Sequence, residues 1–503
     1  MRILLINPAY DGSWFQFHPL KRTFSVYASG VSPPLGLLYV ATVLENQGYE
    51  VSLIDNDALK WSDDELLGYI KETHPDVIGF SILTASCFNA HRLAKEIKDR
   101  YPDIKIIYGG PSATIYPERL MNKYGFVDYL IQGDGEYTTL NLLRELENGQ
   151  NLKNVRGLVY REDKKLVLNE AAPQIRDLDD LPFPNRNLLK TNYDLSLSWG
   201  DFKVRFTVGK YTGMLTSRGC PNSCRFCQAG SNHSGWRGRS AKNVVDELEL
   251  LEGQGYKHVF FVDDNFSADK KRVFEICKLI KERGLKVYWS VEMSVENGSY
   301  EMFEAMKDAG CDSILFGFES ANQRILDYYC KRITPELSRK TVEAARRAGI
   351  SCIIGTFLLG APDETYEEAK RTVDFGFSLD LDALILFSLS VKPDTPIWDE
   401  LKEKGYLTND FIEKRWETSG INVYELNSKL SKRELDTLIE DGYTKFLWRP
   451  EYLVKHIYRN FRHRFRRMWM AKNLRAIAPF LKASLKTRMM KGKEINTKVN
   501  SKV

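Results

Sequence analysis

Residues 1 to about 150 alternate short apolar runs with stretches of helical periodicity. The apolar runs are Ile3–Ile6, Val51–Ile54, Val77–Ser81, Ile104–Tyr108 and Tyr129–Ile131. Helices are expected at Leu35–Asn46, Asp63–Glu72, Asn89–Arg100, Tyr116–Tyr124 and Tyr137–Asn148. Near-continuous apolar strands separated by helices predict an α/β domain with a parallel, doubly wound, Rossmann-like sheet. Ligands of such sheets lie beyond the carboxyl ends of the strands.

Glycines and small polar residues gather at those expected carboxyl ends. The segments are Asn7-Pro8, Ser81–Ser86, Gly109-Gly110-Pro111 and Gly133-Asp134-Gly135-Glu136, with Pro33-Pro34-Leu35-Gly36 at the head of the first helix. Glycine lets the backbone approach a large flat ligand closely, and hydroxyl side chains supply hydrogen bonds. The first domain therefore has the layout of a binding domain, with a generic nucleotide-like or purely structural domain as the alternative.

The pattern changes after residue 150. Residues 151–200 are expected to form a connector, with a hairpin built from 157–160 and 166–168 and an extended proline-bearing linker at 177–184. Residues 201–400 again alternate strands and helices, which predicts six β/α units of an incomplete barrel. Its expected strands are Thr212–Thr216, His258–Asp263, Val287–Val291, Ser313–Phe318, Cys352–Leu359 and Ala383–Leu389. Residues 401–503 are expected to be helical.

Composition indicates a large protein of a reducing compartment. The chain is 43% hydrophobic and 28% charged, and its eight cysteines do not have the number or spacing of a disulfide framework. The first ten residues, MRILLINPAY, indicate a buried strand rather than a signal peptide, and no run of about 18 apolar residues suggests a membrane span. We expect a cytoplasmic protein.

Positive charge is concentrated at the end of the chain. The whole chain has net charge +5, yet residues 451–503 hold 15 Lys/Arg against two Asp/Glu, so the first 450 residues are net acidic. Basic and apolar positions alternate there at helical spacing, which predicts amphipathic helices suited to an anionic inner-membrane surface. Basic residues of the first helix are Lys455, Arg459, Arg462 and Arg466. The alternative is that these helices cap the barrel and face solvent with their charges. Nucleic acid is a less favoured partner because the apolar stripes are one-sided.

Three cysteines carry the clearest chemical signal. Cys220, Cys224 and Cys227 lie within the segment SRGCPNSCRFCQAG, and three thiolates at this spacing can hold three irons of a 4Fe-4S cluster, leaving the fourth iron open. A zinc site is the alternative, but zinc sites usually add a second Cys or His pair, and His233 is the one nearby candidate. The other cysteines are expected to be core thiols: Cys87, Cys277, Cys311, Cys330 and Cys352.

This cysteine segment closely resembles that of the radical S-adenosylmethionine (SAM) superfamily. The resemblance implies that Cys220, Cys224 and Cys227 bind the cluster and that SAM contacts come from Phe226, Asp263, Glu319 and Gly355. Strand-end segments 262–265, 317–320 and 360–365 resemble further motifs of the family. A helix cap or a surface ion pair is the alternative role for the two acids. Arg237 and Arg239 are expected either to meet the SAM carboxylate or to lie in solvent.

The first domain resembles the cobalamin-binding domain that precedes many radical SAM domains. The resemblance implies cobalamin contacts from Asn7, Pro34, Leu35, Gly36, Ser81, Thr84, Gly109, Gly110, Gly133 and Glu136. The Asp-x-His-x-x-Gly motif is absent, so His74 and His91 are expected to be structural, and residues 83–87 are expected under the lower face of the corrin. A methylthiotransferase is excluded because its second cluster needs three cysteines, and residues 1–219 contain only Cys87.

Together the two resemblances imply the branch that contains the anaerobic magnesium-protoporphyrin ester cyclase and the hopanoid methylases. Its cofactors would be the 4Fe-4S cluster, SAM and cobalamin, with an electron donor such as flavodoxin or ferredoxin. The expected reaction is methyl transfer to an unactivated carbon of an apolar or lipid-like substrate. Oxidative cyclisation or carbon–carbon bond formation on a tetrapyrrole or lipid is one alternative, and a corrinoid-binding sensor or carrier with a structural cluster is another. No catalytic residue follows from the sequence.

Overall fold

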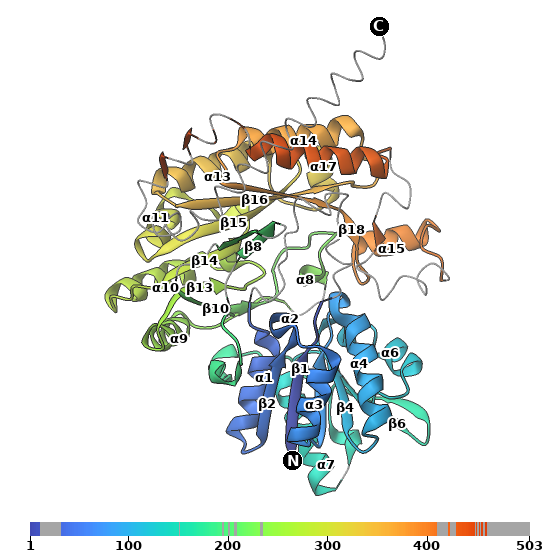
Figure 1. Cartoon of the computed structure of the whole chain (residues 1–503). Coiled ribbons are helices and arrows are strands. Elements are labelled where there is room, and N and C mark those ends of the chain that lie inside the picture. The colour runs from blue at the N-terminus through green and yellow to red at the C-terminus, as the bar shows by residue number, and fades with distance from the viewer. Residues whose placement is uncertain are drawn as a thin grey trace.

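Two mainly parallel sheets organise the chain, each covered by helices (Figure 1). The structure is a computed structural model, and it describes residues 1–10, 32–149, 151–193, 196–199, 202–205, 209–231, 235–409, 421–422 and 429–447, with 449, 452, 454, 455, 458 and 459. The first sheet begins at the N-terminus, and the second belongs to the half-barrel that follows it.

The first sheet has seven strands in the order β2-β1-β3-β4-β5-β6-β7, of which the first five are parallel. Their bounds are β1 Arg2–Asn7, β2 Glu50–Asp55, β3 Val77–Ser81, β4 Lys105–Gly109, β5 Tyr129–Ile131, β6 Leu158–Glu162 and β7 Lys165–Leu168. The expected hairpin of the connector is β6 and β7. It pairs antiparallel with β5 and so extends the first sheet instead of standing apart from it.

Helices cover both faces of this sheet because both faces of its parallel strands are apolar. Ile3 and Leu5 of β1 pack with α1 and α7 on one face, while Leu4 and Ile6 pack with α3, α4 and α6 on the other. The helices are α1 Leu35–Asn46, α2 Asn56–Leu59, α3 Asp63–Thr73, α4 Cys87–Arg100, α5 Pro111–Ile115, α6 Pro117–Lys123 and α7 Gly135–Asn148. The doubly wound domain expected from the sequence is confirmed.

The second sheet has six parallel strands in the order β10-β13-β14-β15-β16-β17, with β10 and β17 as its edges. The bounds are β10 Lys210–Met214, β13 Tyr256–Phe261, β14 Tyr288–Met293, β15 Cys311–Glu319, β16 Cys352–Leu359 and β17 Ala383–Ser388. The helices between them are α9 Ala241–Gly253, α10 Lys270–Glu282, α11 Tyr300–Asp308, α12 Gln323–Tyr328, α13 Pro335–Ala348 and α14 Tyr366–Ser378. The partial (β/α)6 barrel is confirmed.

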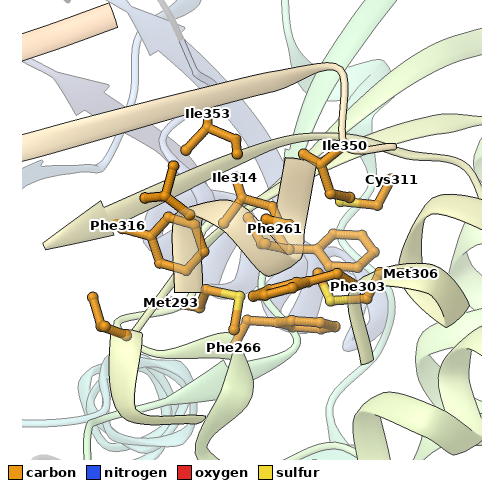
Figure 2. Packing of buried hydrophobic residues seen from close by; sticks show 14 of the residues in the cluster. Phe261, Phe266, Met293, Phe303, Met306, Cys311, Ile314, Phe316, Ile350 and Ile353 are labelled. Atoms are coloured by element: carbon orange, nitrogen blue, oxygen red, sulfur yellow. The ribbon is translucent and has the colours of Figure 1, made fainter. Parts of the chain in front are cut away.

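Alternate side chains of the barrel strands form its outer core. Figure 2 shows Ile314 and Phe316 of β15 with Ile353 of β16 and Phe303 of α11, and all four side chains are buried. Because side chains of a strand alternate between its faces, the residues between these positions face the lumen of the barrel.

Short elements complete the described chain. They are the strand pairs β8 Ser196–Trp199 with β9 Phe202–Arg205, β11 Ser217–Arg218 with β12 Arg237–Gly238, and β18 Ser390–Val391 with β19 Ile421–Asn422, and the helices α8 Gln228–Ser231, α15 Pro396–Glu403 and α17 Lys432–Leu447. Helix α17 packs on α14 and β17 (Figure 1). In the described ranges, no helix is long and apolar enough to cross a membrane.

Most of the expected basic helices after residue 451 lie outside the described residues. Two of their basic positions are described, and both meet acids after α14: Arg459 pairs with Asp380 and Asp382, and Lys455 Nζ lies 3.8 Å from Asp380 Oδ1. Val454 and Tyr458 are 67% and 61% exposed. The described part of this segment therefore contacts the barrel, as the capping alternative expected, but Arg459 meets acids there instead of facing solvent.

Candidate functional site

The three cysteines lie in the loop between β11 and β12. This loop lies where the half-barrel faces the first sheet, and helix α8, which begins just after Cys227, marks it in Figure 1. The loop is held from two later segments. The backbone N–H of Arg225 donates to the carbonyl of Tyr329 at 3.0 Å. The Arg225 guanidinium also lies 2.6 Å from Oε2 of Glu400 in α15. The loop is thus fixed by contacts far away in sequence.

The cysteine thiols are partly buried and close enough to influence one another. Burial raises the pKa of Cys220, and burial raises the pKa of Cys224 to about 11, with Lys331 acting in the opposite direction. Asn265 lies beside Cys220 and lowers its pKa, and the Asn265 Nδ2 is buried without a partner among the N and O atoms of the described chain. This amide, which already acts on the Cys220 sulfur, suits a cluster whose sulfur atoms accept hydrogen bonds. Over the described residues, no three His, Cys, Asp or Glu side chains gather closely enough to hold a single metal ion.

Asp263 holds the entrance of the cysteine loop. Its Oδ1 accepts the N–H of Thr216 at 2.7 Å and of Ser217 at 3.1 Å, and its Oδ2 accepts both hydroxyls at 2.5 and 2.7 Å. The sequence assigned Asp263 to SAM, but the structure gives both carboxylate oxygens to this turn, and the residue is 2% exposed. Asp263 is therefore a positioning residue.

Glu319 and a lysine that the sequence analysis missed form an ion pair beside the cysteines. A bulge in β15 between Gly317 and Glu319 turns the carboxylate back over Gly317, where an added Cβ would collide with Glu319 Oε1. Glu319 itself has φ 62°, a strained backbone for a non-glycine residue. Lys331 Nζ lies 2.8 Å from Glu319 Oε1. This ammonium can bind a carboxylate or balance the charge of the cysteine thiolates.

The other two expected SAM contacts have different surroundings. The ring of Phe226 packs edge-on against Tyr329 at a centroid distance of 5.0 Å, within an apolar cluster shared by both domains. Gly355 faces away from the lumen, since an added Cβ would lie 2.7 Å from Leu381 and 2.9 Å from the ring of Phe318. The glycine at 355 is thus explained by packing, and any contact of this residue with SAM would have to come from its backbone.

Arg237 and Arg239 fit neither of their two expected roles. Arg239 is 3% exposed and pairs with the fully buried Glu247 of α9. Arg237 lies 2.7 Å from Asp134 in the first domain. Both side chains are therefore structural, and neither lies in open solvent.

Three glycines leave the backbone accessible at the carboxyl edge of the first sheet. At Gly36, Gly109 and Gly133, a Cβ added to the backbone would meet no described residue within 4 Å. Gly110 has φ 91° and lies against Ile82 and Ser81, so a side chain there would be strained and crowded. The three open glycines fit the close approach of a flat ring system such as a corrin.

Further residues expected at cobalamin have protein partners. Nδ2 of Asn7 donates to Asp55 Oδ1 at 2.8 Å, and Thr84 Oγ1 lies 3.5 Å from Ser112 Oγ in the expected lower-face loop. Pro34 precedes α1, and Leu35 is 6% exposed. Glu136 is 2% exposed and its Oε1 binds Arg218, so this residue has a protein partner, and its contact with cobalamin stays a prediction.

The two expected structural histidines are confirmed in that role. His91 is buried in α4, its Nδ1 lies 3.1 Å from the Tyr108 hydroxyl, and its ring stacks on Tyr124 at 3.9 Å. Burial lowers the pKa of His91 to about 3. His74 ends α3 in a left-handed conformation.

Glu292 is the second residue that the sequence analysis missed. In β14 it is in register with Leu315 of β15, which pairs with Ile354 of β16 and then Ala383 of β17. The adjacent row, Val291, Ile314 and Ile353, is buried in the outer core, so the Glu292 row faces the lumen. Burial, and to a lesser extent Asp264 and Asp263, raises the pKa of Glu292 to about 7. The sequence does contain a signal for this residue, because a carboxylate within the otherwise uncharged strand YWSVEM indicates a functional position.

Two family descriptions match separate parts of the chain. Residues 214–376 match the Radical SAM superfamily, and residues 22–143 match the B12 binding domain. The first range covers most of the barrel, from the end of β10 into α14, and the second covers the first sheet except β1, β6 and β7.

Several curated proteins are similar over most of the chain. An uncharacterized methyltransferase of Pyrococcus horikoshii is 31% identical, over 91% of this chain and 95% of its own. The anaerobic magnesium-protoporphyrin IX monomethyl ester cyclase of Cereibacter sphaeroides is 26% identical over 80% of this chain and 64% of its own. The hopanoid C-3 methylase of Methylococcus capsulatus is 26% identical over 73% and 68%.

A solved structure shares the fold. The radical S-adenosylmethionine methyltransferase TsrM from Kitasatospora setae, solved with cobalamin and a 4Fe-4S cluster, superposes with a TM-score of 0.63 at 19% identity, covering 80% of this chain and 78% of that one.

Proposed function

The chain belongs to the radical SAM enzymes that carry a B12-binding domain, and from that premise we propose that it transfers a methyl group to an unactivated carbon of an apolar, lipid-like substrate. Its cofactors are those of the family: a 4Fe-4S cluster, SAM and cobalamin. When bound, the reduced cluster and SAM supply a hydrogen-abstracting radical, and cobalamin supplies a methyl carrier.

The proposal rests on one observation: the barrel, which carries the cysteine loop, lies close to the glycine-lined edge of the first sheet. On β10, a Cβ added at Gly213 would lie 2.5 Å from Ser32 Oγ and 3.4 Å from Leu35 Cδ1, next to the open Gly36 of α1. The barrel therefore faces the glycine-lined edge of the first sheet. A substrate held in the lumen can reach both cofactor sites without leaving the protein, as a methyl transfer between them requires.

One row of residues in the lumen wall supports an apolar substrate. The row that contains Glu292 is otherwise formed by Leu315, Ile354 and Ala383. Apolar walls bind hydrocarbon by excluding water, and they shield a radical from side reactions. The single carboxyl of this row favours an amphiphile with one polar group. Lys331, beside Glu319 and the cysteines, is the residue we assign to the carboxylate of SAM.

Mass spectrometry of lipids tests the reaction. An anaerobic, cobalamin-supplied host expressing the chain is fed methionine labelled with deuterium in its methyl group, and total lipids are compared with those from the Cys224→Ala variant. The proposal predicts a cysteine-dependent product that has gained a deuterated methyl group. A product that has lost two hydrogens and gained no label would replace methylation by cyclisation, the candidate favoured by the similarity to the ester cyclase. An unchanged lipid profile would refute the lipid substrate.

Two partners remain proposals. We propose that the basic positions after residue 459 bind an anionic membrane surface, because residues 460–503 hold 13 Lys/Arg against one Asp/Glu. Flotation with anionic vesicles, and its absence with neutral vesicles, would support membrane binding. Equal flotation with both kinds of vesicle would refute it.

We further propose a flavodoxin or ferredoxin as electron donor. The test is whether either protein replaces a chemical reductant in SAM cleavage.

A further inference from the structure

Two arginines connect the cysteine loop to the first domain. Arg218 in β11 and Arg237 in β12 are direct partners in the strand pair that closes this loop. Both arginines bind the same carboxylate, that of Asp134: Arg218 Nη1 lies 3.0 Å from Oδ1, and Arg237 Nη1 lies 2.7 Å from Oδ2. Arg218 also binds Oε1 of Glu136. We call these four side chains the interdomain clamp.

The clamp is mostly shielded from water. The exposed fractions of its side chains are 16% for Arg218, 12% for Arg237, 16% for Asp134 and 3% for Glu136. Burial alone would raise the pKa of Asp134, but the two arginines hold it below its ordinary range. Charge-assisted pairs in such surroundings are strong and directional. The guanidinium of Arg218 also lies 5.3 Å from the ring of Tyr39 in α1, a further contact with the first domain.

Each half of the clamp adjoins a cofactor-facing segment. Asp134 follows the open Gly133, whose N–H donates to Thr114 Oγ1 at 3.0 Å. Arg218 is followed by Gly219 and Cys220. Strands β11 and β12 contain only two residues each. A strand pair this short has little stability of its own, so its orientation depends on what its side chains bind. These contacts form a continuous connection between the glycine edge and the cysteine loop.

We propose that the interdomain clamp positions the cysteine loop according to the state of the first domain, so that bound cobalamin increases the affinity of the cluster site for SAM. The proposal depends on the cofactors of the family and not on the proposed substrate. Coupling between two sites is reciprocal, so SAM must tighten cobalamin binding by the same factor.

The experiment measures SAM binding to the anaerobically reconstituted full-length protein, followed by the electron paramagnetic resonance spectrum of its reduced cluster. SAM is titrated with and without hydroxocobalamin. We expect the dissociation constant for SAM to fall at least about fivefold when cobalamin is present. In Asp134→Asn, each cofactor alone should bind as in the unaltered protein, and the coupling factor should fall to about one, because both arginines lose a charged partner.

A matched control separates the clamp from a general loss of an ion pair. Asp128 of the same domain pairs with Lys98 at 2.8 Å, with side-chain exposures of 24% and 20%. Asp128→Asn should retain the coupling. If Asp134→Asn does not fold, Arg237→Gln removes the same ion pair from the side of the barrel. Equal SAM affinity with and without cobalamin in the unaltered protein would overturn the proposal, as would full coupling in a folded clamp variant. Neither outcome depends on whether a methyl group is transferred.

Discussion

The ammonium of Lys331 lies 2.8 Å from Oε1 of Glu319, and the pair stands beside two of the three cysteines of the loop. Burial lowers the pKa of Lys331, but Glu319 and the thiols of Cys224 and Cys227 more than offset this, and the pKa stays above its ordinary value. Lys331 thus remains positively charged next to the cluster site. A fixed positive charge there stabilises the electron-rich form of any bound group.

The first prediction concerns this charge. Lys331→Met should shift the reduction potential of the cluster to more negative values and weaken SAM binding at least about tenfold, because a charge-assisted hydrogen bond is lost. Redox titration and SAM titration by electron paramagnetic resonance measure both effects. Lys340→Met, at an exposed position of α13, is the control and should change neither. An unaltered potential and SAM affinity in Lys331→Met would remove Lys331 from the site.

The second prediction concerns the glycine edge. Gly36 lies in the first turn of α1 with no described residue in front of it, so Gly36→Leu should fold normally yet occupy part of the expected cobalamin site. Cobalamin retention on a desalting column should fall at least about tenfold, the loss that about 1.4 kcal/mol produces. Gly68→Leu is a matched control, because Gly68 is an exposed glycine of α3 with equally open space. Retention that is equal in both variants would argue against this edge as the corrin site.

The third prediction concerns the entrance of the cysteine loop. Asp263→Asn replaces one carboxylate oxygen by a donor, while Thr216 and Ser217 present four donors to that group. We expect a loss of about 1–3 kcal/mol in stability for the unsatisfied groups, with a lower iron content per chain after reconstitution. Asp269→Asn, which can still cap α10, is the control. Full iron content in Asp263→Asn would show that the turn does not depend on this carboxylate.

The fourth prediction concerns pH. The pKa of Glu292 is raised from 4.5 to about 7 in the folded chain, mainly by burial, so the native state holds a proton that the unfolded state releases between these values. Stability from this group is present below pH 4.5 and falls as pH rises toward 7, by up to about 3 kcal/mol. Glu292→Gln should therefore be more stable than the unaltered chain at pH 8 and no more stable at pH 4.5.

Anaerobic denaturant titration at the two pH values measures this difference. Glu304→Gln is the control, since Glu304 is an exposed residue of α11 on the outside of the barrel. A difference between Glu292→Gln and the unaltered chain that does not depend on pH would contradict a raised pKa.

The fold followed from local pattern in most places. The strand Cys352–Leu359 and the helix Leu35–Asn46 have the predicted bounds, because an apolar run between breakers and a helix after two prolines are both set by neighbouring residues. The hairpin after residue 157 was also predicted, but its pairing with β5 was not. Pairing partners of a strand depend on contacts distant in sequence, which periodicity does not contain.

The site was less predictable for the same reason. The spacing of Cys220, Cys224 and Cys227 is a local signal, and it led to the correct family. Asp263 and Glu136 were assigned to cofactors because of where they stand in their strands and turns, yet they bind Thr216 and Arg218, which are 47 and 82 residues away. The strand alternation around Gly355 could have placed it on the outer face, because its neighbours Ile353 and Phe357 are apolar.

Our central claim is that this chain cleaves SAM reductively at the loop of Cys220, Cys224 and Cys227. The most direct test measures the 5′-deoxyadenosine that the reconstituted protein forms under strong reductant. We predict formation by the unaltered chain and by Cys330→Ala, whose exposed cysteine is outside the loop, and none by a folded Cys224→Ala. Absence of 5′-deoxyadenosine from the unaltered chain, with cobalamin still retained, would contradict the account and favour a corrinoid sensor or carrier. Equal formation by Cys224→Ala would contradict the assignment of the cluster to this loop.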